Sequence, residues 1–348
     1  MKTPFNKPYL TGKETDYIKE VVDSGKIFGD GLFTKKCHQF FEEKYGFKKC
    51  LLTTYCTDVL EMTFILLDIQ PGDEVITPSF TFVSSVNAFV LRGAKIVFAD
   101  SEDASPNIDT QQIESLITSR IKAIVVDHYA GIACDMDTLM TLANKPGISI
   151  VEDAAQAINS FYKGKPFESI RHLSTFSFHE TKNIISGERG MLVINDHQFI
   201  QRAEIIREKG TNRPAFFRGE IDKYGWGDVG SAFLYAQLEN LEDIQTRRKE
   251  VWQMHYNELY PLQELGHIQL PYIPSFATNN AHMFYLVCDN IQEGTELISF
   301  LKTEGYHAVF HYLSLHKSPY YFDKHDSRNL PNCDKFADCL LRLPFFMN

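Results

Sequence analysis

Two stretches of the chain end in residues whose types could do chemistry together. Residues 148–156 read Ile-Ser-Ile-Val-Glu-Asp-Ala-Ala-Gln and place Asp153 at the end of an apolar run. Residues 175–182 read Thr-Phe-Ser-Phe-His-Glu-Thr-Lys and bring Lys182 out of a second apolar run. A carboxylate can keep a pyridine nitrogen protonated, and a lysine amine can form an imine with an aldehyde. Together the two residues predict a pyridoxal phosphate site.

Each of the two residues also has an ordinary explanation. Lys182 could be an exposed loop lysine, and Asp153 could cap the helical turn that follows it. Residues 176–178 lead out of a strand, however, and would aim Lys182 into a crevice at the carboxyl edge of a sheet, where desolvation lowers the pKa of the amine. A protonated pyridine ring would give the Asp153 carboxylate a charged partner, and Gln156 could donate to the phenolic oxygen of the cofactor.

A phosphate group needs backbone amides at a helix start together with hydroxyl groups. Residues 52–57 offer several hydroxyls and lead into a helix that begins near Asp58, and Ser177 could add another hydroxyl. The Asp58 carboxylate would repel a phosphate unless it points away, and ordinary helix capping is the alternative for this segment. The aromatic residues within 78–82 could all belong to the core, or one of their rings could stack on the cofactor.

Signatures of other chemistries are missing from the sequence. Gly29 and Gly31 are followed by Thr34 rather than a third glycine and do not follow a strand, so a dinucleotide fingerprint is not expected. The sequence has no phosphate-binding loop of the G-x-x-x-x-G-K-[ST] type. His311 and His316 have no companions at metal-ligand spacing, so no metal site is expected.

The bulk properties fit an enzyme of the cytoplasm. The net charge of −10 argues against nucleic acid as the main partner. No stretch approaches 18 apolar residues and the N-terminus lacks an apolar signal core, so we expect a cytoplasmic protein without a membrane span. The seven cysteines are odd in number and contain no C-x-x-C pair, which favours reduced thiols.

The elements that must position these residues alternate along the chain. Apolar runs rich in Val, Ile and Phe predict strands at 74–77, 95–99, 123–126, 149–152, 174–178 and 191–194. Helical patterns are found at 14–24, 35–45, 58–67, 84–91, 110–118 and 137–142. Strands without strict alternation are typical of a mainly parallel sheet that helices cover on both faces.

The second part of the chain predicts a smaller α+β lobe. A long charged helix is expected from residue 232 to about 259. It is followed by a loop at 271–274, a strand at 282–287, a helix at 294–304 and a short strand at 308–312. We therefore expect a large cofactor-binding α/β domain over residues 1–230, and a linking helix with a smaller domain over residues 231–348.

Residues 151–156, 176–183 and 187–190 resemble the DegT/DnrJ/EryC1/StrS sugar aminotransferases, and the likeness runs from residue 4 to residue 348. The resemblance implies the fold type I architecture of pyridoxal phosphate aminotransferases and a homodimer whose active sites are shared across the interface. It also implies a role for each of nine residues. These are Lys182 as the Schiff-base lysine, Asp153 as the pyridinium partner, Gln156 near the ring hydroxyl, Cys56, Thr57 and Ser177 at the phosphate, Phe82 stacked on the ring, and His311 and Tyr312 on the substrate side.

The resemblance further implies amino transfer from L-glutamate to a nucleotide-linked keto sugar. Residues 203–213, 216–224 and 308–312 favour dTDP-4-keto-6-deoxyglucose, which would give a dTDP-4-amino-4,6-dideoxyhexose for surface polysaccharide synthesis. In some relatives a histidine replaces the lysine and the enzyme is a dehydratase, so Lys182 favours transamination. The alternatives are a 3-aminotransferase for a 3-keto sugar nucleotide, a cofactor-binding sensor or scaffold without turnover, and, disfavoured by the missing glycine fingerprint, a nucleotide-sugar oxidoreductase.

Four features depart from the family pattern. The usual Ser-Gly-Thr at the phosphate is Tyr-Cys-Thr at 55–57, and the usual Gly-Glu-Gly-Gly contains Arg189. About ten residues that the family carries are missing between Ser231 and Ala232, including a polar residue expected to reach the phosphate of the neighbouring subunit. The chain ends at Asn348, short of the usual C-terminal helix.

Overall fold

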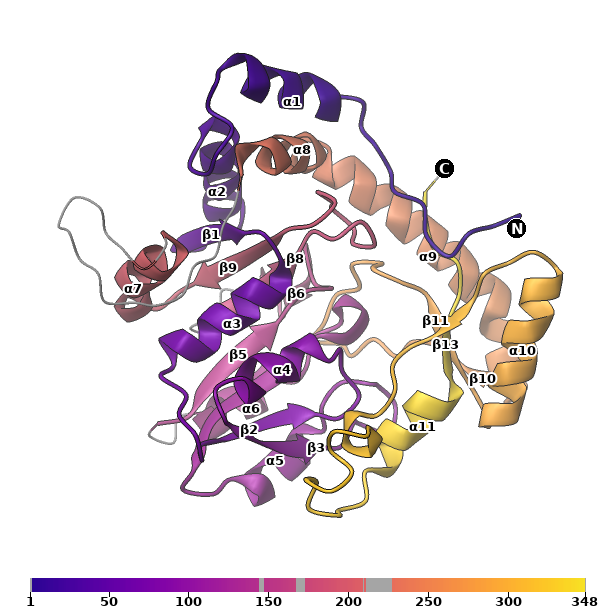
Figure 1. Ribbon diagram of the computed structural model, residues 1–348. Coiled ribbons are helices and arrows are strands. Elements are labelled where there is room, and N and C mark those ends of the chain that lie inside the picture. The colour runs from indigo at the N-terminus through magenta and orange to yellow at the C-terminus, as the bar shows by residue number, and fades with distance from the viewer. Residues whose placement is uncertain (1, 144–146, 167–172, 209, 211–226, 348) are drawn as a thin grey trace.

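The computed structural model describes residues 2–143, 147–166, 173–208, 210 and 227–347. The chain forms a large lobe on a seven-stranded sheet and a small lobe on a four-stranded sheet (Figure 1). Of the segments that carry the resemblance, residues 216–224 lie outside the described residues and residues 203–213 lie outside them in part. The domain boundary at residue 230 stays a prediction.

The large sheet has the strand order β1-β9-β8-β5-β4-β2-β3. β3, β2, β4, β5 and β8 pair in parallel, whereas β9 pairs antiparallel with both β8 and β1. The mainly parallel α/β fold is thereby confirmed, and the structure adds β1, which the sequence analysis did not assign. The strands are β1 (Lys49–Thr53), β2 (Glu74–Pro78), β3 (Lys95–Ala99), β4 (Ile121–Asp127), β5 (Ser149–Asp153), β8 (Leu173–Ser177) and β9 (Gly190–Ile194).

Alternate side chains of these strands face two apolar layers, since successive residues of a strand point to opposite faces. Val125 packs in the layer formed with α3, α4 and α7. Its neighbours Ile124 and Val126 pack in the other layer, with α2, α5 and α6. Burial on both faces explains why the strands read as continuous apolar runs. The helices are α2 (Leu32–Tyr45), α3 (Cys56–Leu66), α4 (Ser84–Val90), α5 (Thr110–Leu116), α6 (Met136–Ala143) and α7 (His197–Arg207).

The single helix predicted from residue 232 to about 259 is wrong. The structure has α8 (Asp228–Leu238) and α9 (Leu241–Glu264), which are separated at Asn240. The Asn240 side-chain amide donates to the Ala236 carbonyl at 2.9 Å and so satisfies an acceptor at the end of α8. A short polar side chain that bonds the local backbone favours such breaks.

α8 joins the large lobe. It packs against α1 (Glu14–Asp23) and α2. It also runs without interruption through Ser231 and Ala232, the point at which the family pattern carries an additional segment. The helices α1, α2 and α8 therefore form one layer at the end of the sheet that carries β1 (Figure 1).

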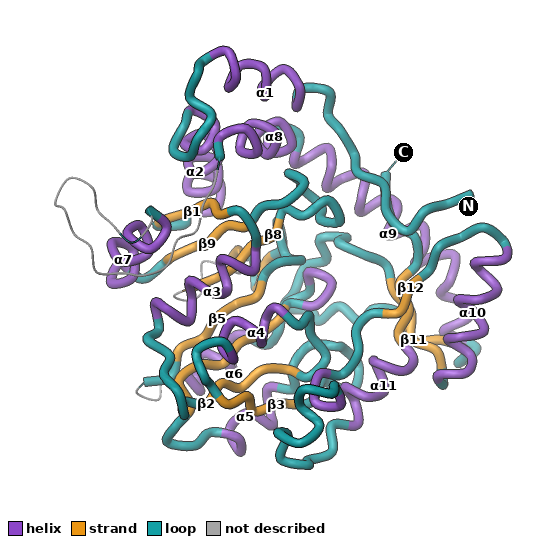
Figure 2. Tube along the Cα trace, in the orientation of Figure 1, coloured by secondary structure: helices purple, strands orange, loops and turns teal. Residues whose placement is uncertain are grey.

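The small lobe has the antiparallel strand order β10-β11-β13-β12, so the predicted α+β lobe is confirmed. The strand expected at 282–287 corresponds to β11 (Tyr285–Cys288), and the helix expected at 294–304 corresponds to α10 (Ile291–Thr303). The sequence analysis did not assign α11 (Pro331–Cys339) or β13 (Leu340–Arg342). Figure 2 shows loops between the strands of the two lobes. The elements are β10 (Ile268–Gln269), β11 (Tyr285–Cys288), α10 (Ile291–Thr303), β12 (Val309–Phe310), α11 (Pro331–Cys339) and β13 (Leu340–Arg342). The described helices include none that is long and apolar enough to cross a membrane.

Candidate active site

Lys182 lies in the loop between β8 and β9, and backbone hydrogen bonds fix that loop. The Phe178 amide donates to the Arg189 carbonyl at 2.8 Å, and the Ser186 amide donates to the Phe178 carbonyl at 2.7 Å. Inside this frame the Lys182 amide donates to the His179 carbonyl at 2.9 Å. The Lys182 side chain is half-buried, and burial lowers the pKa of its amine. A larger fraction of the amine is therefore neutral, and nucleophilic, than on an exposed lysine.

Asp153 is the last residue of β5 and is buried at the carboxyl edge of the sheet. Its Oδ2 accepts a hydrogen bond from the Ser85 hydroxyl at 2.5 Å. Its Oδ1 accepts from the Ala155 amide at 3.2 Å and from the Thr175 hydroxyl at 3.4 Å. Three donors around one carboxyl group suit an anion, which can only accept hydrogen bonds. The site thus holds a fixed negative charge beside the pocket.

The N-terminus of α3 forms another wall of the site. Cys56 and Thr57 occupy its first turn, whose amides have no partner within the helix. The Thr57 hydroxyl donates to Ser84 at 3.2 Å, so two hydroxyl groups lie side by side there. The Asp58 carboxylate caps the helix by accepting from the Tyr55 amide at 3.1 Å, and it does not line the pocket. Burial raises the pKa of Asp58 to about 6.

Gly190 lets this helix start approach the sheet. A Cβ atom at Gly190 would lie 2.4 Å from the Tyr55 carbonyl oxygen and 2.7 Å from Cα of Cys56. Both atoms belong to the backbone and cannot rotate away, so any side chain at this first residue of β9 would displace the N-terminus of α3. Gly190, the residue before the predicted strand 191–194, is therefore required by the close approach of α3.

The small lobe contributes a hydrogen-bonded row of polar side chains. The Arg342 guanidinium donates to Nε2 of His311 at 3.3 Å, and Nδ1 of His311 lies 3.1 Å from the Tyr129 hydroxyl. Since arginine can only donate, Nε2 is the acceptor and Nδ1 carries the proton. Burial and the nearby Arg342 charge hold the pKa of His311 well below its usual range, which keeps the ring neutral.

Arg342 is a buried cation with spare hydrogen-bonding capacity. It is 8% exposed, and its Nε has no hydrogen-bond partner. None of the carboxylates in the described part of the chain lies within ion-pair distance of Arg342. Cζ of Arg342 lies 4.8 Å from the centroid of the Phe5 ring. A buried charge without a counterion is costly, so this group suits an anionic ligand in the pocket.

His282 is a second neutral histidine at the pocket. Its Nδ1 lies 2.9 Å from Oδ1 of Asn183, whose amide nitrogen in turn donates to Gln245 and to the Asn280 carbonyl. The amide oxygen of Asn183 is therefore the acceptor, and Nε2 of His282 is left as an acceptor toward the pocket. Burial, followed by the Lys182 charge, holds the pKa of His282 well below its usual range.

Lys182, Asp153, the first turn of α3 and three residues of the small lobe line one pocket of about 340 Å³; the three are His282, His311 and Arg342. It brings together every residue to which the sequence analysis gave a site role: Cys56, Thr57, Phe82, Asp153, Gln156, Ser177, Lys182, His311 and Tyr312. The sequence analysis gave no role to several further polar residues of this pocket, among them Asp127, His282 and Arg342. Asp127 could have been found, because it directly follows the predicted strand 123–126, as Asp153 follows the predicted strand 149–152. His282 and Arg342 come from the small lobe, whose docking the sequence does not reveal.

The residues present fit pyridoxal phosphate. This cofactor requires a carboxylate for the ring nitrogen, an amine for the aldehyde, and amides with hydroxyls for the phosphate. Asp153, Lys182 and the first turn of α3 offer these groups around one cavity. No cluster of histidine, cysteine, aspartate and glutamate within the described ranges could hold a metal ion.

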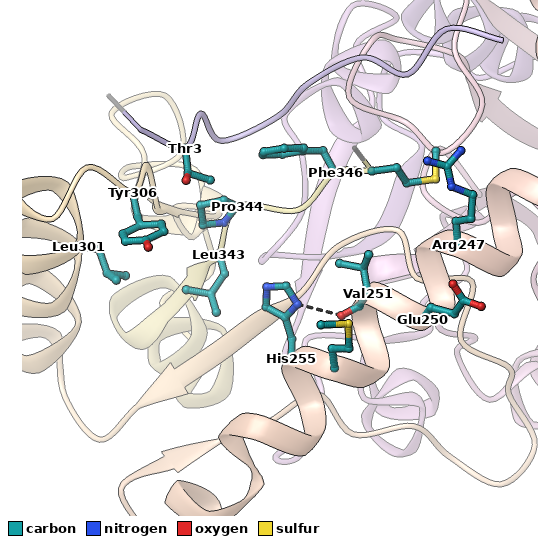
Figure 3. A pocket seen from close by; sticks show the side chains of 12 residues that line it. Thr3, Arg247, Glu250, Val251, His255, Leu301, Tyr306, Leu343, Pro344 and Phe346 are labelled. Atoms are coloured by element: carbon teal, nitrogen blue, oxygen red, sulfur yellow. Dashed lines mark hydrogen bonds between the residues drawn. The ribbon is translucent and has the colours of Figure 1, made fainter.

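A second and larger pocket, of about 600 Å³, lies between α9 and the C-terminal end of the chain (Figure 3). Its walls are mostly apolar, and they include Val251, Leu301 and Phe346. Its lining contains one histidine, His255, whose Nδ1 forms a hydrogen bond with the Val251 carbonyl at 2.9 Å. This pocket offers no lysine or paired carboxylates, so the smaller pocket is the candidate active site.

Comparison with known proteins agrees with this chemistry. Residues 8–348 match the DegT/DnrJ/EryC1/StrS aminotransferase family. DesV from S. venezuelae, solved with a ketimine intermediate, is 28% identical with a TM-score of 0.91, and the match covers 99% of this chain and 93% of DesV. The aminotransferase TlmJ from Streptoalloteichus hindustanus is 27% identical with a TM-score of 0.90, and the match covers 99% and 92% of the two chains.

A more distant structure shares the fold. Spr1654 from Streptococcus pneumoniae in its PLP form is 24% identical with a TM-score of 0.90, and the match covers 100% of this chain and 94% of Spr1654. Together with the sheet topology described above, these similarities confirm the fold type I architecture that the resemblance implied.

Proposed function

This chain belongs to the DegT/DnrJ/EryC1/StrS aminotransferase family, and we propose that it transfers the amino group of L-glutamate to dTDP-4-keto-6-deoxyglucose. The product would be a dTDP-4-amino-4,6-dideoxyhexose. The observation that carries the proposal is that Lys182 and Asp153 lie on the wall of one pocket of about 340 Å³. The enzyme is an aminotransferase that uses pyridoxal phosphate, which supplies an aldehyde for the substrate amine and a ring that accepts electrons from a carbanion.

Lys182 is the residue that handles protons in this proposal. Its amine, whose pKa burial lowers, is nucleophilic at a pH where an exposed lysine would be cationic. When its amine is free, Nζ of Lys182 would take the proton from Cα of glutamate. It would later return a proton to the sugar carbon that receives nitrogen. The His179 turn that holds the Lys182 backbone limits where this amine can reach.

Asp153 keeps the pyridine nitrogen cationic in this proposal. Its three hydrogen-bond donors hold the carboxylate in place, which supports that role. The first-turn amides of α3, with the Thr57 and Ser177 hydroxyls, would bind the phosphate. Phe82, which is 52% exposed at the pocket rim, would cover one face of the ring.

Arg342 and the two neutral histidines are suited to the substrates. The unpartnered Nε of Arg342 would bind the carboxylate of glutamate. Nε2 of His282 would accept a hydrogen bond from a sugar hydroxyl, because its Nδ1 already donates to Asn183. His311 and Tyr312 would orient the same substrates from the small lobe.

The choice of sugar rests on resemblance. Residues 203–213, 216–224 and 308–312 resemble the dTDP-4-oxo-6-deoxy-D-glucose transaminase of enterobacterial common antigen synthesis. We also propose a cytoplasmic homodimer. Exposed aromatic side chains at the pocket support a shared interface, because Tyr55 is 47% exposed and Phe82 is 52% exposed.

Product analysis tests the proposal. The purified protein, loaded with pyridoxal phosphate, would be given L-glutamate and a panel of 3-keto and 4-keto sugar nucleotides. Mass spectrometry should detect an amino sugar nucleotide from dTDP-4-keto-6-deoxyglucose, and NMR should place nitrogen at C4. Nitrogen at C3 would favour the 3-aminotransferase. Binding of the cofactor without any amino product from the panel would favour a sensor or scaffold.

A further inference from the structure

His282 reaches the pocket from residues 278–284, a segment without regular structure that leads into β11. Both polar groups of its backbone are bonded. The His282 amide donates to Oδ1 of Asn280 at 3.0 Å, and its carbonyl accepts from Nη2 of Arg248 at 2.7 Å. The carbonyl of Ala281 accepts from Nε of Arg248 at 3.0 Å. One guanidinium group of α9 therefore holds the backbone on both sides of the His282 Cα atom.

The residue before His282 has a strained backbone. Ala281 has a φ of 51°, in the left-handed region that residues with a Cβ atom rarely adopt. It is fully buried, and its amide donates to Oδ1 of Asn279 at 2.8 Å. Such a conformation persists only where surrounding contacts impose it. The two hydrogen bonds from Arg248 bring such a constraint from a distant part of the chain.

Asn280 fastens the same segment to the large lobe. Its Nδ2 donates to the Gln156 carbonyl at 2.8 Å and to the Ile158 carbonyl at 2.9 Å. The fit on this side is close, because a Cβ atom at Gly131 would lie 2.1 Å from Oδ1 of Asn280. The backbone of His282 is thus fixed between α9 and the loop that follows β5.

Arg248 is a buried cation whose hydrogen bonds go to the backbone. It is 5% exposed, and its Cζ lies 4.9 Å from the centroid of the Phe345 ring. Burial, followed by the Arg342 charge, lowers the pKa of Arg248 to about 9, so the group is still charged at pH 7. Hydrogen bonds from a charged donor are roughly twice as strong as neutral ones, so a neutral side chain would hold the two carbonyls less firmly.

We propose that Arg248 is a positioning residue that fixes the direction of the Nε2 lone pair of His282, so that the enzyme selects keto sugar nucleotides with a hydroxyl group at one place on the sugar. This inference rests on the proposed function, in which that hydroxyl donates to His282. Nδ1 of His282 donates to Asn183 at 2.9 Å, so Nε2 can only accept. A fixed acceptor rejects a substrate without the donor, because the buried lone pair is then left unpaired.

Selectivity measurements test the proposal. kcat/KM would be measured for dTDP-4-keto-6-deoxyglucose and for analogues that each lack one sugar hydroxyl. The wild type should discriminate roughly 5-fold to 10-fold against one analogue, and His282→Ala should abolish that ratio. Arg248→Gln should reduce the same ratio to less than about 2-fold and leave the KM for glutamate unchanged. Lys249→Gln, at an exposed neighbour on α9, is the control and should keep the wild-type ratio.

A merely structural role of Arg248 predicts another result. It would lower kcat/KM equally for the complete substrate and the analogues, so a wild-type ratio in Arg248→Gln would overturn the proposal. Arg248→Lys is the milder change, since it keeps the charge and loses the paired donors, and its ratio should fall between those of the wild type and Arg248→Gln.

A rescue experiment tests whether Arg248 acts through the strained turn. Glycine adopts a positive φ without the steric penalty of a Cβ atom, so Ala281→Gly removes the strain that Arg248 opposes. The double variant Arg248→Gln with Ala281→Gly should therefore regain part of the lost selectivity. A double variant as unselective as Arg248→Gln would contradict this role.

NMR of the cofactor-free protein with ¹⁵N-labelled histidine tests the positioning without turnover. The signals of His282, identified by their loss in His282→Gln, should show a protonated Nδ1 and an unprotonated Nε2 at pH 7. Arg248→Gln should shift or broaden them, because the ring is no longer held against Asn183. Identical signals in the two proteins would overturn the proposal. A wild type without amino transfer to any keto sugar nucleotide would instead overturn the proposed function, and the NMR signals would still report on Arg248.

Discussion

The side chain of Gln156 donates a hydrogen bond to the Tyr312 hydroxyl at 3.0 Å and thereby joins the large lobe to the small lobe inside the pocket. The amide oxygen of Gln156 accepts from the Ala130 backbone at 2.7 Å, which fixes the orientation of the amide group. Tyr312 also packs against Phe80 and Phe82, with ring centroids 5.8 and 5.9 Å away. The contact therefore links residues proposed for the cofactor with residues proposed for the substrate.

Replacement of Tyr312 by phenylalanine should weaken this link and leave the aromatic packing intact. The loss of one buried hydrogen bond, which leaves an amide proton of Gln156 unpaired, costs about 1 kcal/mol. We expect kcat/KM for the keto sugar nucleotide to fall roughly 5-fold, as one hydrogen bond of this size implies. Steady-state kinetics would measure it. Tyr320→Phe, at a residue 51% exposed in the same lobe, is the matched control and should leave kcat/KM unchanged.

Arg342→Gln should raise the KM for L-glutamate. The variant removes a charged donor, and hydrogen bonds to charged groups contribute about 1.5–3 kcal/mol, so KM should rise roughly 10-fold to 100-fold. Relief of an unpaired buried charge should at the same time preserve or raise the melting temperature. Arg247→Gln, which removes a cation that lines the other pocket, is the control. An unchanged KM for glutamate in Arg342→Gln would remove this residue from the proposed donor site.

The sequence predicted the central sheet because its strands are continuous apolar runs, but it did not predict elements that depend on distant partners. β1 contains Lys49 and Cys50 and is recognisable only through its antiparallel pairing with β9. β13 is three residues long and becomes a strand between β11 and β12. The break at Asn240 was missed because the Leu-x-x-Leu spacing continues through it, whereas a side-chain hydrogen bond decides the local backbone.

The candidate site was predictable on the large lobe for a similar reason. Parallel strands bring their carboxyl ends to one edge, so Asp153 and Lys182 could be placed together from sequence. Arg342 could not be placed, because it reaches the pocket only after the small lobe docks against the large lobe. Asp127 fell between these cases, since it directly follows the predicted strand 123–126 just as Asp153 follows strand 149–152, but the carboxylate of Asp153 already accounted for the ring nitrogen.

Gly190→Ala should weaken cofactor binding through the start of α3. Its Cβ would lie 2.4 Å from the Tyr55 carbonyl oxygen, so the backbone that leads into the phosphate-binding turn must move. We expect a lower melting temperature and a roughly 10-fold or greater rise in the Kd of pyridoxal phosphate, since overpacking typically costs 1–3 kcal/mol. A fluorescence titration of the cofactor would measure the Kd.

Gly294→Ala is the matched control for this substitution. Gly294 lies inside α10, and the nearest atoms to an added Cβ are 3.8 Å away. The change should stabilise the protein by about 0.5–1 kcal/mol, because alanine is the better helix former, and should leave the Kd unaltered. Equal Kd values in Gly190→Ala and Gly294→Ala would contradict the positional role of Gly190.

The rate at which cofactor-free protein captures pyridoxal phosphate should depend on pH through Lys182. The neutral amine is the nucleophile, and burial lowers the pKa of this lysine from its ordinary value of 10.5. The second-order rate constant should therefore rise with pH and level off below pH 10.5, whereas a free lysine analogue would still be gaining reactivity there. Stopped-flow absorbance of the bound cofactor would give the profile. Lys182→Ala should abolish the absorbance change and lower turnover by several orders of magnitude, and a profile that continues to rise through pH 10.5 would show that the pocket does not desolvate the amine.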